Sequence, residues 1–202
     1  MLFACSLGLY RYKGSDAASK ILTVLICCTL VIECAAYYLA LKYHHNLELY
    51  SIFSIVEFNF LCLYFNNVID VFRKKNIGVY LGISGTVLGI LNLIFLQHLN
   101  SMNSYFLFLE GFLVIGMCLF AFFRLLLKTD YIQLYKYPHF WFISILVFFW
   151  CITFLNWGLY NYINVKLQHA AWKINIALLV INDITYVAIG LVFLLYPKMQ
   201  KQ

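Results

Sequence analysis

Six apolar stretches, each long enough to cross a lipid bilayer as a helix, constrain this chain more than any other feature of its sequence. A hydrocarbon core about 30 Å thick needs about 20 residues of α-helix, and a helix satisfies its own backbone hydrogen bonds in lipid. The sequence therefore predicts an all-α, polytopic transmembrane helix bundle. The six predicted spanning helices cover residues 21–43, 47–69, 77–97, 103–127, 139–162 and 167–196.

The start of the chain is a shorter apolar segment, Met1 to Tyr12, which is closed by Arg11 and Lys13. About ten apolar residues give roughly 15 Å of helix, half of what a crossing needs. We interpret residues 1–12 as part of a first transmembrane helix that is truncated at its N-terminus. A secretory signal fits less well, because no basic residue precedes the apolar part and no small-x-small cleavage site follows it. The whole architecture is then a seven-helix bundle in one domain, residues 1–202.

The composition agrees with a protein embedded in the lipid bilayer, since 64% of the residues are hydrophobic and 11% are charged. A water-soluble domain usually has about a quarter of its residues charged. The net charge of +6 does not indicate nucleic-acid binding, because the basic residues lie in short segments between the apolar stretches rather than on one face.

The basic residues are distributed unevenly between the two ends of the predicted bundle, eleven against three. This bias places the richer end and the C-terminus in the cytoplasm, by the positive-inside rule. One end has only Lys42, Lys166 and Lys173. The other has Arg11, Lys13, Lys20, Arg73, Lys74, Lys75, Arg124, Lys128, Lys136, Lys198 and Lys201.

Polar residues inside the predicted helices are concentrated in the half away from this basic end, whereas the other half of the last three helices is nearly pure hydrocarbon. Polar groups at one level of a bundle predict a wet or ligand-filled cavity there. Ionisable side chains in lipid are costly and usually functional. The predicted ligand-binding residues are Glu33, Glu57, Glu110, Asn156, Trp157, Asn175, Asp183 and Tyr186.

These residues also have a structural interpretation. Buried asparagines hydrogen-bond neighbouring helices, and Trp157 suits an aromatic belt at the interface. The carboxyl groups favour function more strongly, because an amide would do the same structural work at a lower cost in lipid. Asp183 is expected at the floor of a polar layer that it shares with Glu33, Glu57 and Glu110.

Four glycines, Gly78, Gly82, Gly85 and Gly89, recur at spacings of four, three and four. They share one helical face, which lets another backbone approach closely. Packing within the chain is the preferred interpretation, and a homodimer interface is the alternative.

No motif indicates a catalytic centre, a metal or a cofactor. The cysteines show no CxxC pair at zinc spacing, and HExxH, GxSxG and GxxxxGK[ST] are missing. His44 and His45 fall in a predicted turn, where solvated histidines are the ordinary interpretation. An enzyme is therefore not favoured by the sequence.

Three stretches resemble a family of uncharacterised bacterial seven-helix membrane proteins: AAYYLALKYHHNLELYSIFSIVEF, LYKYPHFWFISILVFFWCITFLNWGLYNY and GLVFLLYPKM. The resemblance implies a location in the bacterial inner membrane and a seven-helix architecture. It transfers no activity and no catalytic residue.

The function hypothesis that follows is a receptor-like or sensory membrane protein. Its cavity would bind a small polar or amphipathic ligand, and its basic loops would contact a cytoplasmic signalling partner. A small-solute or proton-coupled transporter that uses the same carboxyl groups is the alternative. A membrane-embedded enzyme that acts on lipid comes third.

Overall fold

The computed structural model describes residues 1–97, 101–128, 131–166 and 168–200, and every regular element within them is a helix. The described α-helices are α1 (Leu2–Arg11), α2 (Ala17–Tyr43), α3 (Leu47–Val68), α4 (Asp70–Lys75), α5 (Ile77–Leu91), α6 (Ser104–Lys128), α7 (Pro138–Gly158), α8 (Tyr160–Lys166) and α9 (Gln168–Gln200). Short 3-10 turns cover Tyr12–Gly14 and Tyr131–Lys136, and a π-helical turn covers Asn92–Leu96.

Six segments are long and apolar enough to cross a membrane, which confirms the prediction of a multi-pass, all-helical membrane protein. They belong to α2, α3, α5 with its π-turn, α6, α7 and α9: Ala17–Tyr43, Leu47–Val68, Ile77–Leu96, Ser104–Leu127, Pro138–Gly158 and Trp172–Tyr196. Helix α1 has ten residues and is not one of the six. A seventh crossing therefore stays a prediction.

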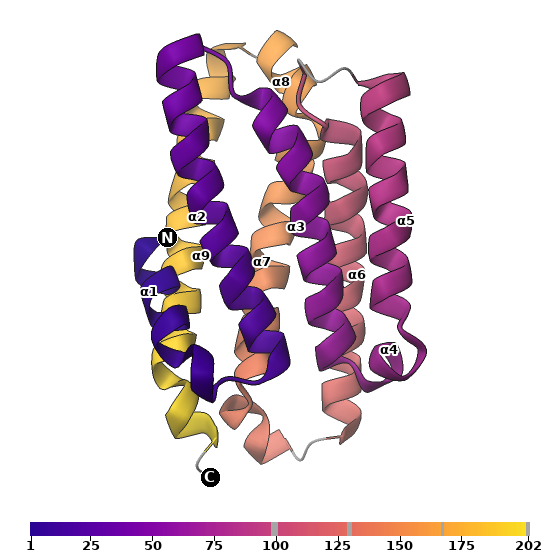
Figure 1. Cartoon of the computed structure of the whole chain (residues 1–202), viewed down its shortest axis with the longest axis vertical. Helices are drawn as coiled ribbons and strands as arrows, with labels where there is room; N and C mark the ends of the chain where they lie inside the picture. The colour runs from indigo at the N-terminus through magenta and orange to yellow at the C-terminus, as the bar shows by residue number, and fades with distance from the viewer. Residues whose placement is uncertain (98–100, 129–130, 167, 201–202) are drawn as a thin grey trace.

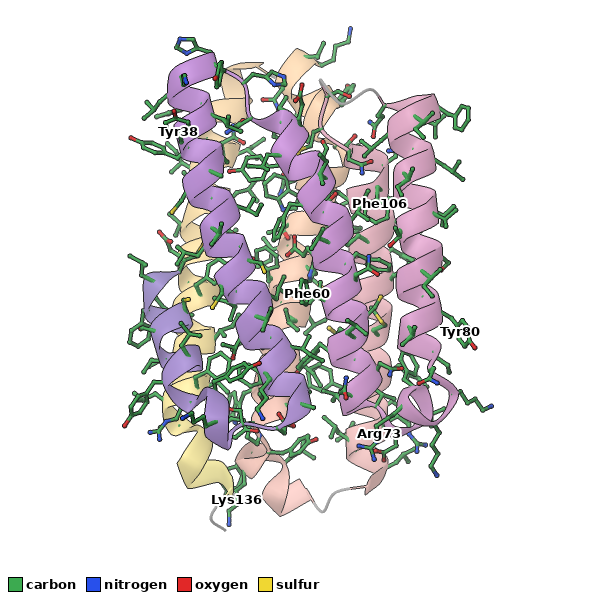
Figure 2. The ribbon with its side chains drawn as sticks, viewed as in Figure 1. Tyr38, Phe60, Arg73, Tyr80, Phe106 and Lys136 are labelled. Carbon is green, nitrogen blue, oxygen red and sulfur yellow. The ribbon has the colours of Figure 1, made fainter. Side chains whose placement is uncertain are left out.

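The long helices run alternately up and down (Figure 1). Helix α2 packs on α3, α6 on both α3 and α7, and α7 on α9, while α1 packs against α9 and α2. Helix α5 lies on the outside of α3. We call the end of the bundle that carries Arg73 and Lys136 the basic end; Tyr38 lies toward the other, which we call the opposite end (Figure 2).

Two helix boundaries differ from the prediction for local reasons. Helix α2 begins at Ala17 rather than at residue 21, because the carboxylate of Asp16 accepts a hydrogen bond from the backbone N–H of Ser19 at 2.9 Å and caps the helix. The predicted helix 139–162 is divided into α7 and α8 at Leu159, which has φ −100° and ψ 10°. Gly158, a poor helix former, directly precedes this break.

The glycine face of α5 packs inside the chain, as preferred from the sequence. All four glycines are buried, and they face α3. A Cβ atom added at Gly82 would lie 2.7 Å from Oδ1 of Asn59, and one at Gly89 would lie 2.7 Å from Cγ1 of Ile55. The same contact is tied by a hydrogen bond of 2.7 Å from Nδ2 of Asn59 to Oγ1 of Thr86. The glycines therefore let α5 approach α3 closely.

Candidate functional site

A cavity of about 340 Å³ lies between the helices in the half of the bundle away from the basic end. Its volume is at the lower end of the range for small-molecule sites. Side chains from α2, α3, α6, α7, α8 and α9 contribute to its wall. The lining residues are Met1, Thr29, Glu33, Asn46, Leu47, Tyr50, Phe53, Ser54, Glu57, Met102, Leu107, Phe149, Trp150, Trp157, Tyr160, Asn175, Leu178, Leu179, Asn182 and Tyr186.

The wall formed by α2 and α3 carries the acidic groups. Tyr50, Ser54 and Glu57 are spaced by four and three residues, so they lie on one face of α3 and all reach the cavity. The hydroxyl of Tyr50 donates a hydrogen bond of 2.9 Å to Oε2 of Glu33 on α2. Glu57 is half-buried, and no hydrogen bond joins its carboxyl group to another described residue. The two carboxyl groups face the same space from neighbouring helices.

The opposite wall is formed by α9 and by the junction of α7 with α8. Helix α9 contributes Asn175, Asn182 and Tyr186 to the lining. The rings of Trp157 and Tyr160 stack across the junction, with their centroids 6.1 Å apart and their planes at 25°. This side of the cavity therefore combines amide groups with an aromatic surface.

Five of the eight residues predicted from the sequence line this cavity: Glu33, Glu57, Trp157, Asn175 and Tyr186. Asn156 does not, and its side-chain amide donates to the backbone carbonyl of Ile152 one turn back in α7.

The position expected for Asp183 is wrong. This residue lies on the exposed side of α9, whereas its neighbour Asn182 lines the cavity. Successive residues of an α-helix point about 100° apart, so the rotation of α9 about its axis decides which of the two faces inward. Asp183 is therefore not the floor of the polar layer.

Glu110 on α6 lies behind the cavity wall instead of in it. Its side chain is fully buried, and neither carboxyl oxygen has a hydrogen-bond partner in the described part of the chain. Leu107, about one turn earlier on the same helix, does line the cavity. Glu110 is thus a carboxyl group within the protein interior, and such groups usually have a hydrogen-bond partner.

Toward the basic end the bundle interior is filled by large apolar side chains. Phe142 and Ile143 of α7, Phe65 of α3 and Phe193 of α9 are fully buried. The rings of Phe142 and Phe193 pack with their centroids 5.0 Å apart. This packing closes the cavity on the side of the basic end.

A hydrogen-bonded network joins four helices at the basic end. Oδ2 of Asp16 lies 2.6 Å from Nε2 of His139, and Nδ1 of His139 lies 3.2 Å from the hydroxyl of Tyr64. The hydroxyl of Tyr196 lies 3.4 Å from both the backbone nitrogen of Asp16 and Oγ of Ser19. His139 and Tyr64 are buried.

Burial by itself would raise the pKa of Asp16, but the hydrogen bond and charge of His139, together with hydrogen bonds from Ser19, outweigh it and hold that pKa well below its usual value. The charged form of Asp16 is therefore favoured at neutral pH.

Sequence reasoning did not find this network. Asp16 and His139 are 123 positions apart, and each has an ordinary local role beside a helix start. The sequence shows Asp16 at the start of one helix and His139 after Pro138 at the start of another. It does not show that the two side chains form a hydrogen bond.

Another polar cluster closes the opposite end between α5 and α6. Nδ2 of Asn92 donates to Oε1 of Gln97 at 2.9 Å and to the side-chain oxygen of Asn103. Gln97 in turn donates to Oγ of Ser104 at 2.8 Å and accepts from the backbone N–H of Tyr105 at 3.1 Å. These bonds satisfy backbone and side-chain groups where α5 ends and α6 begins, so the cluster has a structural role.

Comparisons with known proteins give no relative: no protein-family model, no curated protein and no solved structure matches this chain. Within the described residues, no three histidine, cysteine, aspartate or glutamate side chains gather as a metal site would require. The site is defined by its own geometry as a blind cavity of mixed polarity inside a multi-pass membrane protein.

Proposed function

We propose that this chain is a receptor-like membrane protein that binds a small amphipathic ligand in the cavity. The observation that carries the proposal is a cavity of mixed polarity in one half of the bundle, whereas the other half is filled by large apolar side chains and by one hydrogen-bonded network at the basic end. A binding pocket of mixed polarity, pre-formed and closed at one end, suits recognition of a small molecule.

The distribution of basic residues supports an orientation for this function. If the basic end faces the cytoplasm, the cavity lies in the outward half of the membrane and receives its ligand from outside or from the outer leaflet. From the resemblance of three sequence stretches to bacterial seven-helix membrane proteins, we propose that this membrane is the inner membrane of a bacterium. Signal output would then go through the basic segments around Arg73 and Lys136 to a cytoplasmic partner.

Two neighbouring residues of α9 provide a matched test of the cavity. Asn182 lines it and Asp183 does not. Native mass spectrometry of the protein purified in mild detergent would measure the occupancy of small molecules bound to the wild type and to the variants Asn182→Ala and Asp183→Ala. We expect the first variant to lose bound ligand and the second to keep it. Equal occupancy of bound small molecules in all three proteins would refute the proposal that the cavity is the binding site.

Glu110 favours proton-coupled transport as a second candidate. Its carboxyl group is fully buried and has no hydrogen-bond partner among the described residues, and acidic side chains inside transmembrane helices mark proton relays in pumps and transporters. Transport also requires a second conformation that opens toward the basic end.

Two native cysteines report on that opening. Cys62 and Cys118 are fully buried, whereas Cys34 and Cys151 are exposed. An apolar maleimide should label Cys34 and Cys151 with and without ligand, and this labelling is the internal control for thiol reactivity. A receptor keeps Cys62 and Cys118 unlabelled with and without ligand. Ligand-dependent labelling of either one by a water-soluble maleimide would favour transport.

A further inference from the structure

The ionisable side chains in the cavity wall are all of one sign. Glu33 and Glu57 line the cavity, and among the described residues that line it none is a lysine, arginine or histidine; Met1, which carries the α-amino group, also lines it. A carboxylate in a partly buried site is stabilised by an opposite charge or by hydrogen-bond donors. A ligand that supplies both would therefore complement this wall.

The hydroxyl groups around the two glutamates are already engaged within the protein. Oγ1 of Thr29 donates to the carbonyl oxygen of Leu25 at 2.9 Å, and Oγ of Ser54 donates to that of Ser51 at 3.0 Å. The hydroxyl of Tyr50 donates to Glu33. Each of these groups has one hydrogen to donate and keeps acceptor capacity. The α2 and α3 side of the cavity is thus rich in acceptors, whereas the donor groups of Asn175, Asn182 and Tyr186 come from α9.

The aromatic side of the cavity suits a cation as well. Trp157 and Tyr160 are stacked, and indole and phenol faces attract ammonium groups through the ring quadrupole. Phe53, Phe149 and Trp150 add apolar surface to the lining. A ligand with one cationic group and an apolar or aromatic body would contact both kinds of wall.

The cavity volume limits the size of such a ligand. A volume of 340 Å³ corresponds to about eleven water molecules at roughly 30 Å³ each. The space therefore accepts a molecule of about ten non-hydrogen atoms, the size of a small arylalkylamine.

From the acidic wall, the aromatic wall and the volume we propose that the cavity recognises a small organic ammonium ion. The ammonium group sits against Glu33 and Glu57, and the apolar part packs toward Trp157 and Tyr160. This inference rests on the proposed ligand-binding function and specifies the chemical class of the ligand.

The test is a panel of compounds that share an arylethyl group and differ in the polar group attached to it. Phenethylamine, 2-phenylethanol and phenylpropanoate, together with the corresponding indole compounds, would be titrated into the purified full chain in lipid nanodiscs by isothermal calorimetry. We expect the amines to bind at least about tenfold more tightly than the alcohols, because hydrogen bonds to charged groups contribute about 1.5–3 kcal/mol. Glu57→Gln should weaken amine binding by a similar factor and leave alcohol binding unchanged, while Asp183→Asn should alter neither.

The outcomes separate the two proposals. Alcohols or carboxylates that bind as tightly as the amines, in a manner sensitive to Asn182→Ala, would overturn the ammonium assignment and keep the ligand-binding function. Unchanged amine affinity in Glu57→Gln would also overturn the assignment. If no compound of the panel binds, the ammonium assignment is overturned, and the native mass spectrometry of Asn182→Ala and Asp183→Ala decides the proposed function separately.

Discussion

Replacing Glu110 by methionine should stabilise this protein, although it removes a charged residue type from the middle of a helix. The glutamate side chain is fully buried, and neither of its oxygens has a hydrogen-bond partner among the described residues. Leaving a buried polar group unpaired costs about 1–3 kcal/mol. Methionine has a similar length and shape and no such group, and the neighbours Phe106 and Val114, four residues away on either side, are apolar and buried.

We therefore expect Glu110→Met to raise the free energy of unfolding by about 1–3 kcal/mol. Glu110→Gln keeps an unpaired polar head group at the same place and should change the stability much less. Glu57→Met is the matched control, since Glu57 lines the cavity and is not fully buried. Its gain should be smaller than that of Glu110→Met, because the cavity lets water reach the wild-type carboxyl group.

Equilibrium unfolding in mixed detergent micelles, followed by circular dichroism, would measure these differences. A loss of 1 kcal/mol or more in Glu110→Met would refute the reasoning, because it would mean that the carboxyl group has a stabilising partner. A stabilised variant that binds the same ligands would show that the cost of Glu110 is unrelated to binding. Stabilisation together with loss of activity would identify Glu110 as a group kept for function at the expense of stability.

Three further predictions concern the fold and its orientation. Asp16→Asn should keep the helix cap but lose the charged partner of His139. The pKa of Asp16 is held below its usual value in the folded protein. The ionised carboxylate of Asp16 therefore stabilises the fold above about pH 4, and this stabilisation is lost as the pH falls further. Thermal unfolding across the acid range should therefore show a lower melting temperature for this variant at neutral pH and convergence with the wild type in acid, and parallel curves would contradict the role of the pair. Gly85→Ala should destabilise the contact between α5 and α3 by about 1–3 kcal/mol, because the added methyl group meets the buried ring of Phe58. The control Gly116→Ala adds its methyl group in open space and should be neutral or stabilising by up to about 1 kcal/mol. Equal effects of the two variants in chemical denaturation would argue against close packing at the glycine face. A green fluorescent protein fused after residue 202 should fluoresce in bacterial cells and alkaline phosphatase fused there should be inactive, since the basic end is expected in the cytoplasm, and the reverse pattern would invert the proposed orientation.

Much of the candidate site was predictable because helical spacing by itself groups residues. Tyr50, Ser54 and Glu57 lie on one face of any α-helix, and all three line the cavity. The rest depended on how each helix is rotated about its axis. On α9 the spacing also placed Asp183 with Asn175 and Tyr186, yet the packing of α9 turns Asn182 inward and leaves Asp183 exposed.

The sequence by itself determined that the chain forms long apolar helices that cross a membrane, because length and hydrophobicity are local properties of each segment. It also predicted that the intramembrane carboxyl groups gather away from the basic end, and Glu33 and Glu57 do line a cavity there. Only the tertiary structure decided which side chains meet: it brings Glu33 and Glu57 to one cavity, encloses Glu110 without a hydrogen-bond partner among the described residues, and joins Asp16 to His139. The reason is physical, since contacts between helices depend on their rotation and packing, which no single segment of the chain specifies.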